Sequence, residues 1–129
     1  MTGLQTYLPT VGRILIAIIF VLSGFNKLTG MEGTVGYMEA YGLPGILIWP
    51  TIVVELGGGL LLLVGYQTRL AAAALAAFTL ASGIIFHSNF ADQMEMISFL
   101  KNLAITGGAL YVVAYGAGAF SVDDRRATA

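Results

Sequence analysis

Four long runs of apolar residues dominate the chain, and short polar segments separate them. The runs cover about residues 10–28, 46–66, 69–87 and 97–115. A helix needs about 20 apolar residues to cross the hydrocarbon core of a membrane, and each run has roughly that length. The pattern therefore predicts an all-α membrane protein, a four-transmembrane-helix bundle that forms a single domain over residues 1–129.

The segment between the first two runs has a different pattern. Glycines interrupt residues 29–44, while apolar side chains recur at helical spacing: Met31, Val35, Met38 and Tyr41. This spacing is typical of a short amphipathic helix that lies along the membrane surface. Pro44 is expected to end the segment, because the residue before a proline is pushed out of helical geometry.

The ends of the runs give weaker signals. Pro9 is suited to the first turn of a helix, where its missing N–H is not needed, so the first span is expected to begin near Thr10. Residues 90–97 are expected to form an exposed loop with some helix. The tail, residues 116–129, is polar and contains Asp123, Asp124, Arg125 and Arg126.

Composition agrees with a membrane location and narrows the chemistry. The chain is 57% hydrophobic and 10% charged, whereas soluble domains average about 25% charged residues. It has no cysteine and one histidine, His87, which excludes disulfides and thiolate ligands and predicts no metal site within one copy. No basic cluster indicates nucleic-acid binding.

The charges that remain are distributed unevenly. Four arginines, Arg13, Arg69, Arg125 and Arg126, are expected at the helix ends on the side of the two termini. The lysines, Lys27 and Lys101, belong to the opposite side. Because cytoplasmic segments of membrane proteins carry the excess of lysine and arginine, both termini are expected in the cytoplasm.

Glu55 lies about halfway along the second run, and it is the first residue that needs a structural explanation. A charged side chain at the centre of a membrane costs roughly 2.5–3.5 kcal/mol, so it normally faces the bundle interior and a partner. Three glycines follow at positions 57–59, and small residues let a neighbouring helix approach closely. Glu55 is therefore expected beside a tight helix contact.

Antiparallel alternation of the spans places further polar groups near Glu55. Four helices are expected to direct side chains into one cavity in the outward half of the bundle, and the candidates are Asn26, Lys27, Glu55, His87, Lys101 and Asn102. Arg13 lies fourteen residues before Lys27, about 21 Å of helix, on the cytoplasmic side of Glu55. Both cations lie within reach of the Glu55 carboxylate, and the sequence leaves the choice of partner open.

Each of these residues also has an ordinary structural interpretation. Lys27 and Arg13 at helix ends reach lipid headgroups in many membrane proteins. His87 at an interface is often solvated or caps a helix. A buried Glu55 ion pair can simply fix the register of two helices, and Asn102 can be an ordinary interhelical hydrogen-bonding group.

In order along the chain, these residues resemble the DoxX-like family of small four-helix inner-membrane proteins. The resemblance rests on Arg13, on FVLSGFNKL at residues 20–28, on ELGG at residues 55–58, on His87 and Asn102, and on GAFSVD at residues 118–123. It covers nearly the whole chain. It implies an inner-membrane location and a role described for relatives as oxidoreductase or as a subunit of quinone-linked systems.

Three functions remain open at this point. The first is a quinone-linked oxidoreductase component, in which Glu55, Lys27 and His87 would be catalytic and Arg13, Asn26, Lys101 and Asn102 would hold the ligand. The second is a non-catalytic structural subunit of a larger membrane complex. The third is a small solute-binding or transport module, either alone or as a homo-oligomer. Because the chain has no evident redox centre, the first function needs electrons from a partner or a bound cofactor.

Overall fold

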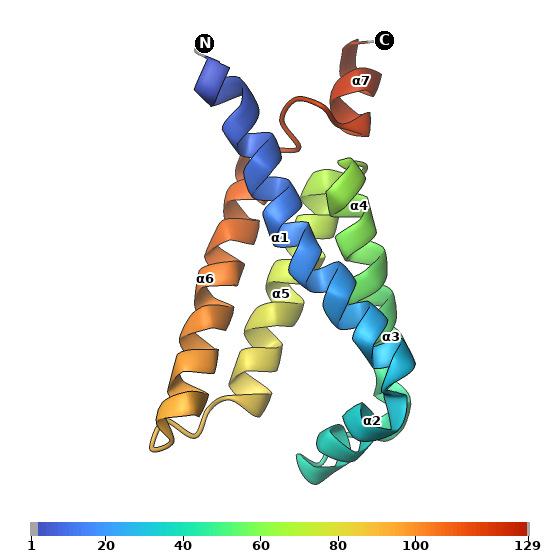
Figure 1. Ribbon diagram of the computed structural model, residues 1–129, viewed down its shortest axis with the longest axis vertical. Coiled ribbons are helices and arrows are strands. Elements are labelled where there is room, and N and C mark those ends of the chain that lie inside the picture. Colours follow the sequence, from blue (N-terminus) through green and yellow to red (C-terminus); the bar gives the residue numbers. More distant parts are fainter. Residues whose placement is uncertain (1–2, 129) are drawn as a thin grey trace.

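The computed structural model describes residues 3–128, and every regular element in that range is helical (Figure 1). In chain order the elements are α1 (Gly3–Thr29), α2 (Met31–Ala40), the 3-10 turn η1 (Gly45–Leu47), α3 (Ile48–Ile52), the π-helical turn η2 (Val53–Gly57), α4 (Gly58–Val64), α5 (Thr68–Phe86), α6 (Gln93–Tyr115) and α7 (Val122–Thr128). Within this range four stretches are long and apolar enough to cross a membrane: α1, Gly45–Val64, α5 and α6.

These four stretches and the short helix α2 confirm the predicted bundle, but the prediction for the start of the first helix is wrong. Pro9 does not open this helix, since α1 is already helical from Gly3 and contains Pro9 in its interior. The polar tail, whose secondary structure was not predicted from the sequence, contains the short helix α7 from Val122. The α6 helix begins at Gln93, so part of the predicted 90–97 loop is helical, as expected.

The helices pack unequally. The α5 and α6 helices lie against each other along their length, while α1 crosses α4 and η2 and meets α6 only briefly (Figure 1). The main core contains buried residues of four spans: Ala17, Phe20, Leu62, Ala72, Leu75 and Val112. Both described ends of the chain lie at the same end of the bundle, as an even number of spans requires.

Glycine makes the closest contact between α1 and the second span. A Cβ atom on Gly24 would lie 2.8 Å from the backbone nitrogen of Leu56, and one on Gly59 would lie 3.0 Å from the backbone nitrogen of Val21. Only glycine allows two helix backbones to come this close. The tight contact expected beside Glu55 is present, and Gly24 contributes as much to it as the glycine run does.

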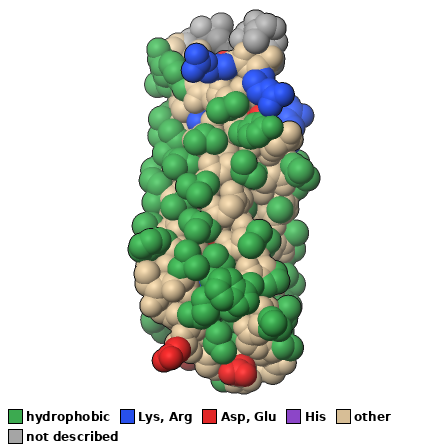
Figure 2. Space-filling model, turned by 90° about the vertical axis from the view of Figure 1, so that its right-hand side faces the viewer, with side chains coloured by type: hydrophobic (Ala, Val, Ile, Leu, Met, Phe, Trp, Pro, Cys, Tyr) green, Lys and Arg blue, Asp and Glu red, His purple; other side chains and the backbone are tan. Residues whose placement is uncertain are grey.

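The outer surface agrees with insertion in a bilayer. Figure 2 shows apolar side chains covering the middle of one face, with arginine side chains at the end that carries the termini and acidic side chains at the other end. The α6 helix is the least enclosed span, with 17% of its most apolar window buried inside the bundle. Most of its apolar surface therefore faces the surroundings of the bundle.

Candidate functional site

A cavity of about 600 Å³ opens between the spans in the half of the bundle away from the termini. Sites for small ligands commonly have volumes of roughly 300–1,000 Å³ and walls that are mostly apolar, with a few polar groups. The wall comes from α1, α2, the second span and α5, and consists of Lys27, Gly33, Thr34, Tyr37, Met38, Leu43, Leu47, Pro50, Thr51, Glu55, Phe78, Ala81, Ser82, Ile85, Phe86 and His87.

The charged pair Lys27–Glu55 is the main polar feature of this wall. Lys27 Nζ lies 2.5 Å from Glu55 Oε1, and the two side chains are 24% and 6% exposed. The two charges neutralise each other in the membrane interior. Of the two cations that the sequence left open, Lys27 is therefore the partner of Glu55.

The local backbone explains how Glu55 reaches this position. Glu55 lies in η2, a single π-helical turn within an otherwise α-helical span. Such turns are uncommon, and they often occur at functional sites, where the inserted residue changes the direction in which side chains point. The π turn was not predicted from the sequence.

The close approach of α1 holds the other half of the pair in place. Gly24 contacts Leu56, the residue that follows Glu55, and Lys27 lies three residues after Gly24 on the same helix. Residues three apart on a helix lie on the same face. The backbone contact at Gly24 therefore brings Lys27 to the Glu55 carboxylate.

His87 lies at the end of α5, where it lines the cavity. Its Nδ1 atom is 3.2 Å from Oε2 of Glu95, which lies in the first turn of α6. The contact joins the outer ends of α5 and α6 beside the cavity. Glu95 was not among the predicted site residues, because only the fold brings the two helix ends together.

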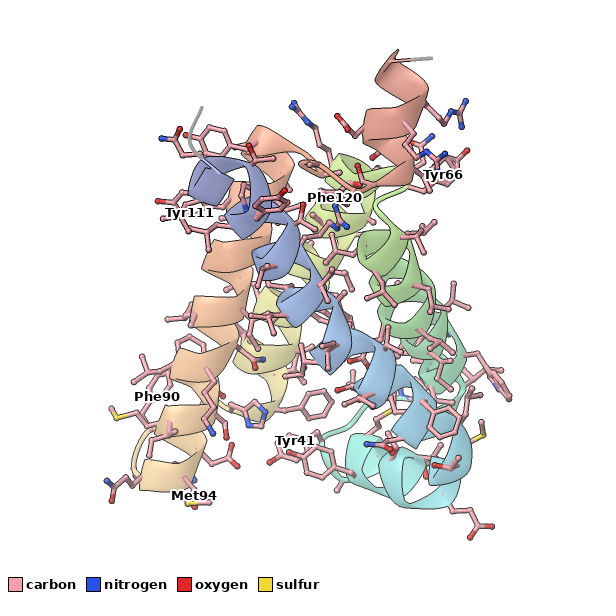
Figure 3. All side chains as sticks on the ribbon, turned by 45° about the horizontal axis from the view of Figure 1, so that its top comes forward. Tyr41, Tyr66, Phe90, Met94, Tyr111 and Phe120 are labelled. Atoms are coloured by element: carbon pink, nitrogen blue, oxygen red, sulfur yellow. The ribbon has the colours of Figure 1, made fainter. Side chains whose placement is uncertain are left out.

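Three aromatic rings pack together between α2 and α5, and two of them, Tyr37 and Phe86, line the cavity. The ring centres of Tyr37 and Phe86 are 5.2 Å apart, those of Tyr41 and Phe86 are 5.1 Å apart, and those of Tyr37 and Tyr41 are 5.0 Å apart. Aromatic pairs at these distances attract each other by about 0.5–1.5 kcal/mol beyond their burial. Figure 3 shows Tyr41 on the side of α2 that faces α5.

Arg13, a predicted ligand-binding residue, lies outside the cavity wall. It is 2% exposed, and its guanidinium donates hydrogen bonds to the backbone carbonyls of Ala117 at 2.5 Å, Phe120 at 3.2 Å and Leu63 at 3.5 Å. These contacts connect α1 to the segment before α7 and to the end of α4. Arg13 therefore holds three segments of the fold together and does not face the cavity.

The remaining predicted residues also lie outside the wall. Asn26 and Lys101 are exposed. Asn102 donates a hydrogen bond to the carbonyl of Thr79 at 3.1 Å and so joins α6 to α5. Three predicted site residues, Lys27, Glu55 and His87, thus share the cavity, and the other four do not line it.

Asp123 is a second polar feature near Arg13. Its two carboxylate oxygens accept hydrogen bonds from the backbone N–H groups of Gln67 at 3.0 Å and Thr68 at 2.9 Å, at the start of α5. Partial burial acts to raise the pKa of Asp123, but the hydrogen bonds from Thr68 and Gln67 outweigh it and hold the pKa below its ordinary value. This carboxylate joins the tail to α5.

The family model and the similar proteins found by comparison agree on one family. The sequence model of the DoxX family matches residues 8–88. The chain is 47% identical to "Inner membrane protein YqjF" of Escherichia coli over 113 residues, which cover 88% of this chain and 87% of that protein. It is 34% identical to "Inner membrane protein YphA" of the same organism over 89% of this chain and 87% of the relative.

A third relative carries a name that refers to a reaction. "Putative oxidoreductase CatD" of Bacillus subtilis is 38% identical over 102 residues, which cover 74% of this chain and 75% of the relative. No solved structure matches the chain. The matched residues, 8–88, include most of α1 and all of α2, the second span and α5. Every residue of the cavity wall lies within them.

Proposed function

The chain belongs to the DoxX family of inner-membrane proteins, and from this premise we propose that it is the ligand-binding component of a quinone-linked membrane oxidoreductase. The observation that carries the proposal is the pair Lys27–Glu55, which faces a cavity of ligand size. The name of the relative CatD supports the reaction class. The quinone is inferred from the apolar wall and its few polar groups.

The site has the parts needed to bind a quinone and move its protons. Lys27 would donate a hydrogen bond to one carbonyl oxygen of the ring, and this favours the negative charge that develops there on reduction. Reduction to the quinol consumes two electrons and two protons, one for each ring oxygen. His87 and Glu55 would relay these protons from water, and Glu55, which is ionised in its pair with Lys27, would first take up a proton and then pass it on. The chain's side chains provide no redox centre, so the electrons come from a partner protein or a second cofactor.

The structure offers a surface for such a partner. Most of α6 is not covered by the rest of the bundle, and its exposed apolar side chains include Leu100, Leu103, Leu110 and Tyr111. In the proposed arrangement α6 contacts either the electron-donating protein or a second copy of the chain. The cavity lies on the other side of α5, where it stays accessible in such a complex.

A purely structural role is the main competing function. A subunit that only fixes the register of a larger complex would be expected to have a filled interior, and its charged pair would have no open space beside it. The cavity beside Lys27 and Glu55 favours ligand binding over this alternative. A transport module is also less favoured, because four short spans without inverted repeats give no basis for alternating access.

We further propose that both termini are cytoplasmic. The end of the bundle with the termini carries Arg13, Arg69, Arg125 and Arg126, while the other end carries Glu32, Glu39, Asp92 and Glu95. Cytoplasmic segments carry the excess of basic residues. A fluorescent protein fused to the C-terminus is expected to fold and fluoresce, and an alkaline phosphatase fused there is expected to be inactive. The reverse pattern would refute this orientation.

The ligand proposal is tested by identifying what the cavity holds. Protein extracted in mild detergent should carry a quinone that mass spectrometry of the lipophilic extract detects. Glu55→Gln and Lys27→Met should lose it while they remain folded, as judged by thermal unfolding. If wild type and both variants carry the same small molecules, the site does not bind through this pair, and the structural role becomes the better account.

A further inference from the structure

The cavity has two edges that differ in chemistry, and the difference indicates how a ligand enters. One edge faces the end of the bundle, between α2 and the end of α5. The other faces sideways, between the outer half of the second span and α5. This inference rests on the proposed function, since it concerns the route and the chemical class of the same ligand.

The end-facing edge carries aromatic side chains. Tyr37 stacks on Phe86 with ring planes 25° apart, and Tyr41 packs edge-on against Phe86. Met38, which is 5% exposed, packs with Ile48 and Ile52 and so holds α2 against the second span. These groups narrow the path from the aqueous end into the cavity, although Tyr37 and Tyr41 are each 45% exposed.

The sideways edge is open and apolar. Its rim consists of Leu47 and Pro50 on the second span and Ala81 and Ile85 on α5, and all four are exposed residues that also line the cavity. They lie within two of the membrane-spanning stretches. Exposed apolar side chains at this depth contact lipid chains, so this opening faces the bilayer.

Helix packing explains why the opening exists. The α5 helix packs against α4 and η2, and much less against α3. The second and third spans therefore touch in the half near the termini and diverge in the other half. Glu55 lies eight residues beyond Leu47, about 12 Å further along the span, so the charged pair lies inward of the rim.

We propose that this gap, the lateral portal formed by Leu47, Pro50, Ala81 and Ile85, admits the ligand from the bilayer. The ligand is an amphiphile: its polar head reaches Lys27 and Glu55, and its apolar chain passes between α3 and α5 into the lipid. A water-soluble solute does not fit this route. An isoprenoid quinone and a phospholipid both have this general chemistry, and the experiments below distinguish them.

The chain contains one tryptophan, Trp49, which allows a direct test. In a Trp49→Phe background, Phe78→Trp places the sole tryptophan in the cavity wall. In bilayers of phosphatidylcholine with brominated acyl chains, its fluorescence should be quenched, whereas aqueous iodide should leave it unchanged. Quenching by iodide without quenching by brominated chains would overturn the portal, and so would the absence of quenching by either.

Matched substitutions on α5 show whether the portal carries this quenching. Ala81→Phe narrows the rim, while Ala77→Phe makes the same change at an exposed position that does not line the cavity. Ala81→Phe should cause loss of quenching by the brominated chains, and Ala77→Phe should not. Ile85→Phe and Ile84→Phe form a second matched pair, with 42% and 55% exposure in the unmodified protein. Equal quenching in both members of both pairs would overturn the proposal.

A second measurement does not depend on the tryptophan variants. Binding of a decyl-substituted benzoquinone and of the same ring without a chain is compared by calorimetry in lipid nanodiscs. Ala81→Phe should weaken binding of the decyl compound far more than that of the ring alone, and equal weakening would overturn the portal. If wild type binds neither compound but shows the quenching pattern above, the portal stands with a phospholipid as the amphiphile, and the quinone function falls.

Discussion

Arg13 and Lys27 lie on the same helix, both facing the bundle interior, but their surroundings differ. Arg13 is enclosed, and three backbone carbonyls from two other segments accept its hydrogen bonds. Lys27 has one carboxylate partner and open space beside it. A charge whose hydrogen bonds all go to the backbone stabilises the fold, whereas a charge beside a cavity is available to a ligand.

The same contrast holds for the two halves of the bundle. In the half near the termini, the tail residues and α7 cover the ends of α1, α4 and α5 through Arg13, Asp123 and the hydrogen bond from Thr10 to Ala119. In the other half the spans diverge and leave the cavity. We expect the first half to account for stability and the second for ligand binding, and the following substitutions test that division in order of decreasing effect on the free energy of unfolding.

Arg13→Met should have the largest effect on stability. It leaves three buried or partly buried carbonyls without a donor, and loss of charged hydrogen bonds of this kind costs about 3 kcal/mol or more. Thermal unfolding in detergent should show a large fall in Tm, and gel filtration should show aggregation. A variant that unfolds like wild type would mean that Arg13 does not hold the tail against the bundle.

Gly24→Ala should have the next largest effect. Its new Cβ would lie 2.8 Å from the Leu56 backbone, and such overpacking costs about 1–3 kcal/mol and pushes α1 away from η2. Ligand content should fall too, because Lys27 moves away from Glu55. The control is Gly12→Ala on the same helix, where a Cβ meets nothing within 4 Å, so stability should rise by about 0.5–1 kcal/mol. Equal effects at the two sites would refute the close contact.

Asp123→Asn should have a smaller effect that depends on pH. The pKa of Asp123 is lower in the folded protein than in the unfolded chain, so its ionised form stabilises the fold above the unfolded value of about 4. This stabilisation is lost as the pH falls through the folded-state pKa. The free energy of unfolding should therefore be measured as the pH is lowered through this range. It should fall for wild type and should not show this fall for Asp123→Asn. Parallel pH profiles of wild type and Asp123→Asn would contradict the role of this carboxylate in joining the tail to α5.

The double variant Lys27→Met/Glu55→Gln should have the smallest effect on stability and a large effect on the ligand. Removing both members of a buried ion pair is often neutral, because the cost of burying the two charges disappears together with their attraction. The free energy of unfolding should change by less than about 1 kcal/mol. Ligand content should be lost. Strong destabilisation with the ligand retained would show that the pair serves to fix helix register.

Much of the fold could be predicted from the sequence. The length of the four apolar runs predicted the four spans, and the helical spacing of apolar residues in 29–44 predicted α2. Both signals are local in the sequence. The start of α1 and the presence of α7 could not be predicted in this way. Gly118 packs against Pro9, and Asp123 binds the start of α5, so both features depend on contacts between segments far apart in the sequence.

Only part of the candidate site could be predicted, because the rest depends on how the helices pack. Counting residues gives the depth of a side chain in the membrane but not the direction in which it points around its helix. Lys27, Glu55 and His87 share both depth and direction and meet at the cavity. Lys101 and Asn102 have a suitable depth, but α6 packs on α5 rather than on the cavity, so Asn102 faces Thr79 instead.

If the half of the bundle away from the termini holds a ligand against Lys27 and Glu55, a crystal structure of the protein grown from a lipidic mesophase should show it. We expect elongated density in the cavity, with a polar end in hydrogen-bond contact with Lys27 Nζ and a chain that leaves between α3 and α5. A cavity that has collapsed, with α3 packed against α5 and no ligand between them, would contradict it.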